Sequence, residues 1–259
     1  MENISTAKNR IHLLDGIRGL AVFCMIFYHA FYILDTSFGI SGAKELFDFF
    51  LPVQPMFAGI FILICGISCT LSRSNLKRGL ILLGIAVGMT FVTAFVMPKM
   101  GFVECEIYFG ILHFLSISIL IYVLLSKRIS KTSLFSGILV CAVLYAFTSR
   151  IGEGALAYGN LLSFKLPEKL YETNLLVPLG IYNSDFFSAD YFPLFPDIFI
   201  FFAGVFAGKH FIAKGYPDWC YENKLPFFSF LGRNALVIYV VHMPVIYGVM
   251  YGLDLIFNL

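Results

Sequence analysis

The stretch that decides the fold is RIHLLDGIRGLAVFCMIFYHAFYIL, residues 10–34, because it is apolar enough to cross a membrane yet carries ionisable side chains. Asp15, Arg18, Val22, Met25 and His29 follow one another at steps of three or four residues, so on an α-helix they share one face. An ionised side chain in hydrocarbon costs at least ~2.5 kcal/mol. We therefore expect this face to point into a protein interior or a hydrated cavity.

The composition indicates the class of protein. The 259 residues are 59% hydrophobic and 13% charged, whereas soluble domains are about 25% charged. The sequence therefore predicts an all-α, polytopic membrane protein built as a transmembrane helical bundle. The net charge of +2 is small and the charges are spread between apolar segments, which argues against a nucleic-acid partner.

Seven apolar segments approach the ~20 residues that a transmembrane helix needs. They lie at about 13–34, 54–72, 77–97, 107–126, 132–149, 192–209 and 228–250. Residues 150–191 are rich in glycine and proline, which predicts an extracytoplasmic loop or a re-entrant insertion, although an eighth span is conceivable there. We interpret residues 1–259 as a single transmembrane domain.

The distribution of lysine and arginine predicts a cytoplasmic N-terminus, because cytoplasmic loops carry an excess of these residues. In that orientation eleven cations lie inside and five outside. The inside ones are Lys8, Arg10, Arg73, Lys77, Arg78, Lys127, Arg128, Lys131, Lys209, Lys214 and Lys224. The outside ones are Lys44, Lys99, Arg150, Lys165 and Lys169.

The first span places an arginine and a histidine at different depths. His29 follows Arg18 by eleven residues, about 16 Å along a helix, so Arg18 is expected near the cytoplasmic surface and His29 near the membrane centre. Asp15 is the natural ionic partner of Arg18 at i, i+3, and that pairing can be its whole role.

Two further histidines occur within predicted spans. His113 follows Glu106 by two turns on the same face of residues 107–126, and His242 follows Asn234 by two turns in the last span. Either histidine can be a simple hydrogen bond between helices, worth about 0.6 to 2 kcal/mol. The alternative roles are general base, nucleophile or proton relay.

Motifs for other chemistry are missing from the sequence. No HxxxH, HxxE or CxxC spacing occurs within a span, so no metal site is predicted. There is also no Walker loop, dinucleotide fingerprint or GxSxG elbow. The basic stretch SRSNLKR, residues 72–78, is either a topology signal or an anion site.

Five blocks of the chain together resemble a known family. They are RIHLLDGIRGLAVFCMIFYH, FAGIFILICGISCTLSRSNLKRGLILL, YFGILHFLSISIL, DYFPLFPDIFIFFAGVFAG and FLGRNALVIYVVHMPV. They resemble the bacterial relatives of the heparan-α-glucosaminide N-acetyltransferase catalytic domain. The arginine–x10–histidine spacing of Arg18 and His29 is also similar to the first-helix motif of the acyltransferase-3 integral membrane O-acyltransferases.

The resemblance implies a multi-pass acetyltransferase of the bacterial cell membrane. It would move an acetyl group from cytoplasmic acetyl-CoA to an amine or hydroxyl of a sugar, glycan or other small polar acceptor reached from the extracytoplasmic side. Membrane lipid is then a further partner, and a homodimer is plausible.

The resemblance also suggests roles for individual residues. The catalytic candidates are His29, His113 and Asp15, with His29 as general base or acetyl carrier. The candidates for the CoA phosphates are Arg18, Arg73, Lys77, Arg78 and Arg233, because guanidinium groups suit bidentate phosphate contacts. The candidates for orienting the acceptor are Glu106, Asn234 and His242.

Two other functions compete with acetyl transfer. A proton-coupled small-molecule transporter would also use buried His, Asp and Arg, but such folds commonly carry paired repeats, and the sequence has no convincing one. A non-catalytic membrane scaffold would explain the apolar bulk and not the shared face of Asp15, Arg18 and His29.

Overall fold

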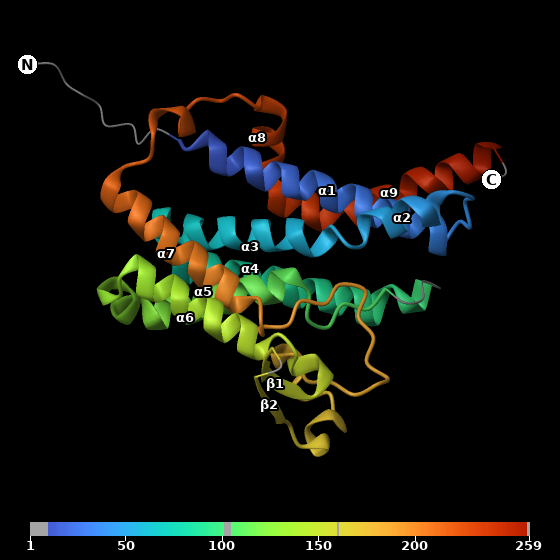
Figure 1. Cartoon of the computed structure of the whole chain (residues 1–259). Coiled ribbons are helices and arrows are strands. Elements are labelled where there is room, and N and C mark those ends of the chain that lie inside the picture. The colour runs from blue at the N-terminus through green and yellow to red at the C-terminus, as the bar shows by residue number, and fades with distance from the viewer. Residues whose placement is uncertain (1–9, 101–104, 160, 258–259) are drawn as a thin grey trace, which may run out of the picture. The chain divides into compact units, whose positions relative to one another are not determined.

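The computed structural model describes residues 10–100, 105–159 and 161–257, and its regular structure is almost entirely helical (Figure 1). Lys8, which was counted for the orientation, lies outside the described residues. The α-helices are α1 (His12–Thr36), α2 (Ala43–Phe50), α3 (Gln54–Leu71), α4 (Asn75–Phe91), α5 (Ile111–Lys131), α6 (Leu134–Thr148), α7 (Ile198–Lys214), α8 (Pro226–Arg233) and α9 (Ala235–Phe257). The prediction of an all-α polytopic fold is confirmed.

Six helical stretches of the described chain are long and apolar enough to cross a membrane. They are His12–Thr36, Gln54–Leu71, Asn75–Met100, Ile111–Lys131, Leu134–Glu153 and Ala235–Leu253. Each overlaps one of the seven predicted spans, and α7, with 17 residues, overlaps the remaining one.

Two helices begin later than the sequence predicted. α5 starts at residue 111 because the preceding segment is extended: Glu106 O accepts from Ala189 N at 2.9 Å and Phe109 O from Phe192 N at 3.0 Å. α7 starts at residue 198, after Pro193 and Pro196. Proline has no N–H and disfavours helical geometry in the residue before it, so a helix across 192–197 would be strained.

The last predicted span is interrupted. α8 ends at Arg233 and α9 begins at Ala235, with Asn234 between them in a non-helical conformation. The side-chain amide of Asn234 donates to the carbonyl of Phe230 at 2.9 Å, and the backbone N–H of Asn234 donates to the same carbonyl at 3.2 Å, so Asn234 caps the last turn of α8.

The region 150–191 contains a small hairpin that the sequence did not predict. β1 (Ala155–Tyr158) pairs antiparallel with β2 (Leu162–Lys165), and short 3₁₀ turns lie on either side. The described residues of this region contain no helix long enough to cross a membrane.

The chain forms two compact units, which we describe separately. The first unit comprises residues 1–64 and 215–259, and the second comprises residues 65–214. In the first unit α1 packs against α8, α2 and α9 (Figure 1). In the second unit α4 packs against α5, and α6 packs against α7.

The backbones of α1 and α8 touch at two glycines. A Cβ at Gly19 would overlap with the carbonyl oxygen of Phe228, and a Cβ at Gly232 would overlap with the carbonyl oxygen of Asp15. Glycine is therefore required at both positions for this distance between the helices.

In the second unit a lysine caps the C-terminal end of α5. The ammonium group of Lys209, on α7, donates to the carbonyls of Ile129 at 3.0 Å, Ser130 at 2.6 Å and Thr132 at 2.7 Å. These carbonyls lie at the C-terminal end of α5, where the helix dipole attracts a positive charge; that of Ile129 also accepts from the backbone N–H of Thr132 at 3.2 Å.

Replacing either contact glycine should destabilise the first unit. We expect Gly19→Ala and Gly232→Ala each to lower the free energy of unfolding by about 1–3 kcal/mol, because the added methyl group forces α1 and α8 apart. Gly248→Ala on α9 is the matched control, since a methyl group added there meets no neighbouring helix or side chain within 4 Å, and it should be neutral or stabilising by up to ~1 kcal/mol. Thermal unfolding in detergent measures all three. Equal melting temperatures for the three variants would contradict the close approach.

Candidate functional site

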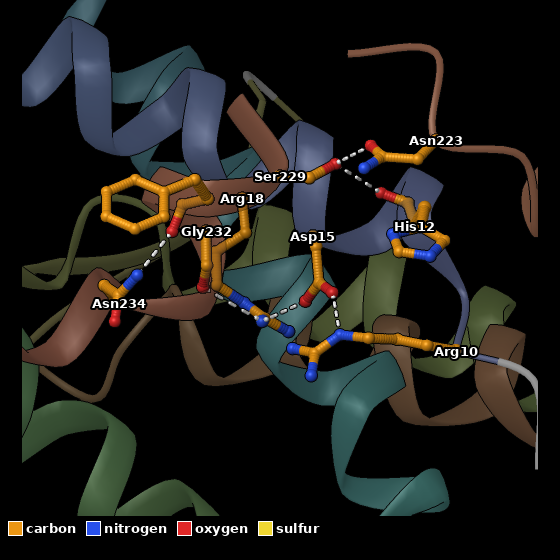
Figure 2. Close-up of polar contacts among 9 residues, drawn as sticks. Arg10, His12, Asp15, Arg18, Asn223, Ser229, Gly232 and Asn234 are labelled. Carbon is orange, nitrogen blue, oxygen red and sulfur yellow. Dashed lines mark hydrogen bonds and ion pairs between the residues drawn. The ribbon is translucent and has the colours of Figure 1, made fainter. Parts of the chain in front are cut away.

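The first half of α1 holds a buried carboxylate between two guanidinium groups. Asp15 is 5% exposed, and it accepts a hydrogen bond from Arg10 Nε on one oxygen and from Arg18 Nη1, at 3.2 Å, on the other (Figure 2). The hydrogen bond to Asp15 raises the pKa of Arg10. Two arginines around one aspartate leave this cluster with one net positive charge.

The cluster is tied to α8. Arg18 Nη1 also lies 3.4 Å from the carbonyl of Gly232, in the last turn of α8, where carbonyls lack partners within the helix (Figure 2). Arg233 is exposed and follows directly in the chain. The predicted phosphate-binding residues Arg18 and Arg233 therefore both belong to the region where α1 meets the end of α8.

Further along α1, two of the predicted site histidines contact each other. His29 Nδ1 lies 3.1 Å from His242 Nε2 on α9, and the ring centroids are 4.9 Å apart. The other nitrogen of His242, Nδ1, lies 2.6 Å from the backbone carbonyl of Tyr239 and is buried. The first unit thus places His29 and His242 in one hydrogen-bonded chain.

The carbonyl of Tyr239 determines where the protons of this pair lie when both rings are uncharged. A carbonyl only accepts, so His242 carries its proton on Nδ1 and has a lone pair on Nε2. His29 must then donate from Nδ1 to that lone pair. The lone pair of His29 is consequently on Nε2, which is the basic and nucleophilic position of its ring.

His113 has a different environment in the second unit. Its Nδ1 accepts from the backbone N–H of Gly110 at 3.3 Å, so its proton lies on Nε2, 3.2 Å from the hydroxyl of Thr90. The Thr90 hydroxyl in turn donates to the carbonyl of Ile107 at 2.7 Å. Both ring nitrogens of His113 are therefore hydrogen-bonded.

The start of α5 is held by a second carboxylate. Asp190 Oδ2 accepts from the backbone N–H of Ile111 at 3.0 Å, which satisfies one open donor at this helix N-terminus. A Cβ at Gly110 would collide with the Asp190 carboxylate. The predicted partner of His113, Glu106, contributes its backbone carbonyl to Ala189 instead, and the described contacts of His113 do not include the Glu106 side chain.

The basic stretch 72–78 comprises the turn between α3 and α4 and the first turn of α4. Ser74 caps α4 by accepting from the backbone N–H of Lys77 at 3.4 Å, and a guanidinium nitrogen of Arg78 lies 3.9 Å from Cys69 Sγ. Arg73 and Lys77 are exposed. Lys77 and Arg78 in the first turn of a helix oppose its dipole, an arrangement that favours a nearby anion.

Several contacts at these sites could not be found from the sequence. The spacing of residues identified the face of α1 with Asp15, Arg18 and His29, but Arg10 precedes the helix and has no periodic relation to Asp15. His242 lies 213 residues from His29 in the chain, and only folding brings the two together. Gly19 and Gly232 were visible as small residues in apolar segments, which is a weak signal for close helix contact.

No group of three or more His, Cys, Asp or Glu that could hold a metal ion occurs in the described part of the chain. The residues of these sites carry imidazole, carboxylate and guanidinium groups, which can support proton transfer, nucleophilic attack and anion binding.

Comparison with known proteins places the chain in a family. The model of the family "Heparan-alpha-glucosaminide N-acetyltransferase, catalytic" matches residues 10–244. Neither the curated proteins nor the solved structures contain a match. The matched range includes Asp15, Arg18, His29, His113 and His242. The chain therefore belongs to the heparan-alpha-glucosaminide N-acetyltransferase catalytic family and is a multi-pass membrane protein.

Proposed function

We propose that the protein transfers an acetyl group from acetyl-CoA to an amine or hydroxyl of a small polar acceptor, such as a sugar or glycan, and that His29 takes the proton of the acceptor. The observation that carries this proposal is the hydrogen-bonded pair of His29 and His242. The order of its hydrogen bonds leaves the lone pair on His29 Nε2. Membership of a membrane acetyltransferase family supports acetyl transfer as the reaction.

In the proposed reaction the acceptor nitrogen or oxygen forms a bond to the thioester carbonyl carbon. The carbon–sulfur bond breaks, the sulfur leaves as the CoA thiolate, and His29 Nε2 takes the proton of the acceptor. His29 then becomes a cation. Its Nδ1–H continues to donate to His242 Nε2, so His242 stabilises the charge while the Tyr239 carbonyl holds the ring of His242 in place.

The same lone pair also suits an acetyl carrier. In that version Nε2 itself attacks the thioester carbonyl, the CoA thiolate leaves, and the acetyl group passes from the imidazole to the acceptor. Both versions need the lone pair on His29 Nε2. Asp15 is proposed as a positioning residue, because it holds Arg18 and Arg10 rather than a histidine.

For the donor, we propose that Arg18 and Arg233 contact the CoA phosphates. The cluster of Arg10, Asp15 and Arg18 has a net positive charge, and Arg233 adds a second one beside Gly232. His29 lies about 16 Å further along α1 than Arg18, a length that an extended pantetheine arm can span. One helix would then hold both the phosphate end and the reacting end of the donor.

The predictions for the second unit, and for Asn234 of the first unit, stay separate proposals. His113 has no open lone pair, so we assign it to positioning the loop before α5. Arg73, Lys77 and Arg78 remain candidates for an anion because they lie at the N-terminus of α4. Glu106 and Asn234 remain candidates for orienting the acceptor, although the amide of Asn234 already bonds to Phe230.

A proton-coupled transporter is the second candidate, because a hydrogen-bonded histidine pair is also suited to proton relay. It differs in one measurable property. A transporter of this kind has no need for CoA, so binding of CoA by the purified protein favours the acetyltransferase.

The cytoplasmic donor requires the orientation predicted from the charges, and single cysteines can test it. In a variant without the six native cysteines, we expect a membrane-impermeant maleimide to label Ser184→Cys in intact cells. Ser130→Cys should be labelled only after permeabilisation. Both serines are exposed in the structure, so a difference in labelling reports the side of the membrane and not burial within the protein. The reverse pattern would overturn the orientation.

Loss of Arg18 on α1 or of Arg233 at the end of α8 should weaken CoA binding. We expect Arg18→Gln and Arg233→Gln each to raise the Kd for CoA roughly tenfold, because a charge-assisted contact to phosphate is lost, and the difference from wild type should shrink at high salt. Lys224→Gln is the matched control, since Lys224 is an exposed cation of the same unit paired with Glu222. Isothermal titration calorimetry measures the affinities. An unchanged Kd for both arginine variants would exclude this site.

Replacing the proposed base should stop catalysis without loss of donor binding. We expect His29→Gln to lower the rate of acetyl transfer by about 10²- to 10⁴-fold, because glutamine keeps hydrogen bonding but is not basic. His242→Gln should lose less, because its amide oxygen can still accept from His29 Nδ1. His210→Gln, outside both histidine sites, is the control. Near-normal transfer by His29→Gln, with normal CoA binding, would contradict the assignment of His29 as the base.

A further inference from the structure

The β1–β2 hairpin has one apolar and one polar face. Its register pairs Leu156 with Phe164 and Tyr158 with Leu162, and alternate residues of a strand point to the same side, so these four side chains share a face. The opposite face carries small or polar residues, among them Ala157 and Lys165.

Large side chains of the apolar face are exposed. Phe164 is 56% exposed, Leu162 54% and Tyr158 43%, and Leu161 at the turn is 83% exposed, whereas Leu156 is half-buried. On the opposite face Ala157 is buried, and Ser163 and Lys165 are exposed. A hairpin that meets water on one side normally turns its polar residues outward. Here Tyr158, Leu162 and Phe164 are exposed together on one face, which indicates that this face of the hairpin contacts an apolar phase.

The chain holds the hairpin at the end of a membrane-spanning stretch. The stretch Leu134–Glu153 ends two residues before β1, and the backbone N–H of Ala155 donates back to the carbonyl of Arg150 at 3.2 Å. The rings of Phe147 on α6 and Phe164 on β2 are in edge contact, with centroids 6.4 Å apart. Figure 1 shows the hairpin at the C-terminal end of α6.

The exposed surface of α6 is apolar as well. Leu139, Val140 and Val143 are 52%, 54% and 46% exposed, as expected for a helix that faces lipid. The ring contact of Phe147 with Phe164 makes the apolar face of the hairpin continuous with this helix. The hairpin cannot lie in the hydrocarbon itself, because its open strand edges need water or headgroups as hydrogen-bond partners.

We propose that the apolar face of the β1–β2 hairpin inserts into the interfacial layer of the lipid bilayer beside the end of α6. Tyr158 and Phe164 then belong to the aromatic belt at the membrane surface, and Leu161 and Leu162 reach the beginning of the acyl chains. Lys165, on the opposite face, extends its ammonium group towards lipid phosphates.

Quenching by brominated lipid tests this placement. The chain has a single tryptophan, so the Trp219→Phe background allows one new tryptophan to be observed. In nanodiscs of brominated-chain phosphatidylcholine we expect the emission of the Phe164→Trp variant to fall about twofold or more relative to unbrominated lipid, because an interfacial ring meets the acyl chains. The neighbouring Lys165→Trp variant, on the opposite face, should be quenched much less. Tyr158→Trp replaces Phe164→Trp if that variant does not fold.

Two results would overturn the proposal. Equal quenching of the variants on the two faces would show that the hairpin has no lipid-facing side. A blue-shifted but unquenched emission of Phe164→Trp would show that protein, such as a second copy of the chain, covers the face instead of lipid.

Discussion

The close approach of α1 and α8 is the contact on which the rest of the first unit depends. Gly19 and Gly232 let the two backbones touch, and this distance brings the carbonyl of Gly232 within reach of Arg18. α8 ends at Arg233, and after Asn234 the chain continues as the separate helix α9, whose His242 contacts His29. The contact of Arg18 with α8 therefore follows from a steric condition between two helices.

The two groups of polar residues on α1 illustrate two ways of placing polarity in an apolar segment. At the helix start the charge of Asp15 is balanced by two arginines, so the carboxylate is never buried alone. At His29 no ion partner is present in the described contacts; its ring is hydrogen-bonded to the ring of His242, which in turn donates to the carbonyl of Tyr239. The first arrangement suits the binding of an anion at a membrane surface. The second gives an imidazole hydrogen-bond partners without a counter-ion.

The sequence predicted the helical class and the face of α1 because both depend on local patterns. The lengths of the apolar segments predicted where the membrane-spanning helices lie. The steps of three and four residues placed Asp15, Arg18 and His29 on one face of α1. The start of α5, the late start of α7 and the break at Asn234 depend on hydrogen bonds between distant segments or on local backbone geometry, which apolar length does not encode. The sequence also could not predict that His242 contacts His29, because any histidine in a membrane span was a possible neighbour. For His113 the sequence suggested Glu106, two turns earlier, whereas the described ring contacts are with Thr90 and Gly110.

Lys209 has a consequence for the order in which the second unit forms. Its ammonium group supplies the hydrogen bonds that the end of α5 lacks, yet it lies 80 residues after Ile129. During synthesis the α5–α6 turn is made long before Lys209 leaves the ribosome, and until then its carbonyls depend on water or headgroups. The turn reaches its final set of bonds only when α7 docks. α7 therefore completes the hydrogen bonds of the α5–α6 turn after both helices have been synthesised. The conformation of this helical hairpin is then stabilised by the docking of α7.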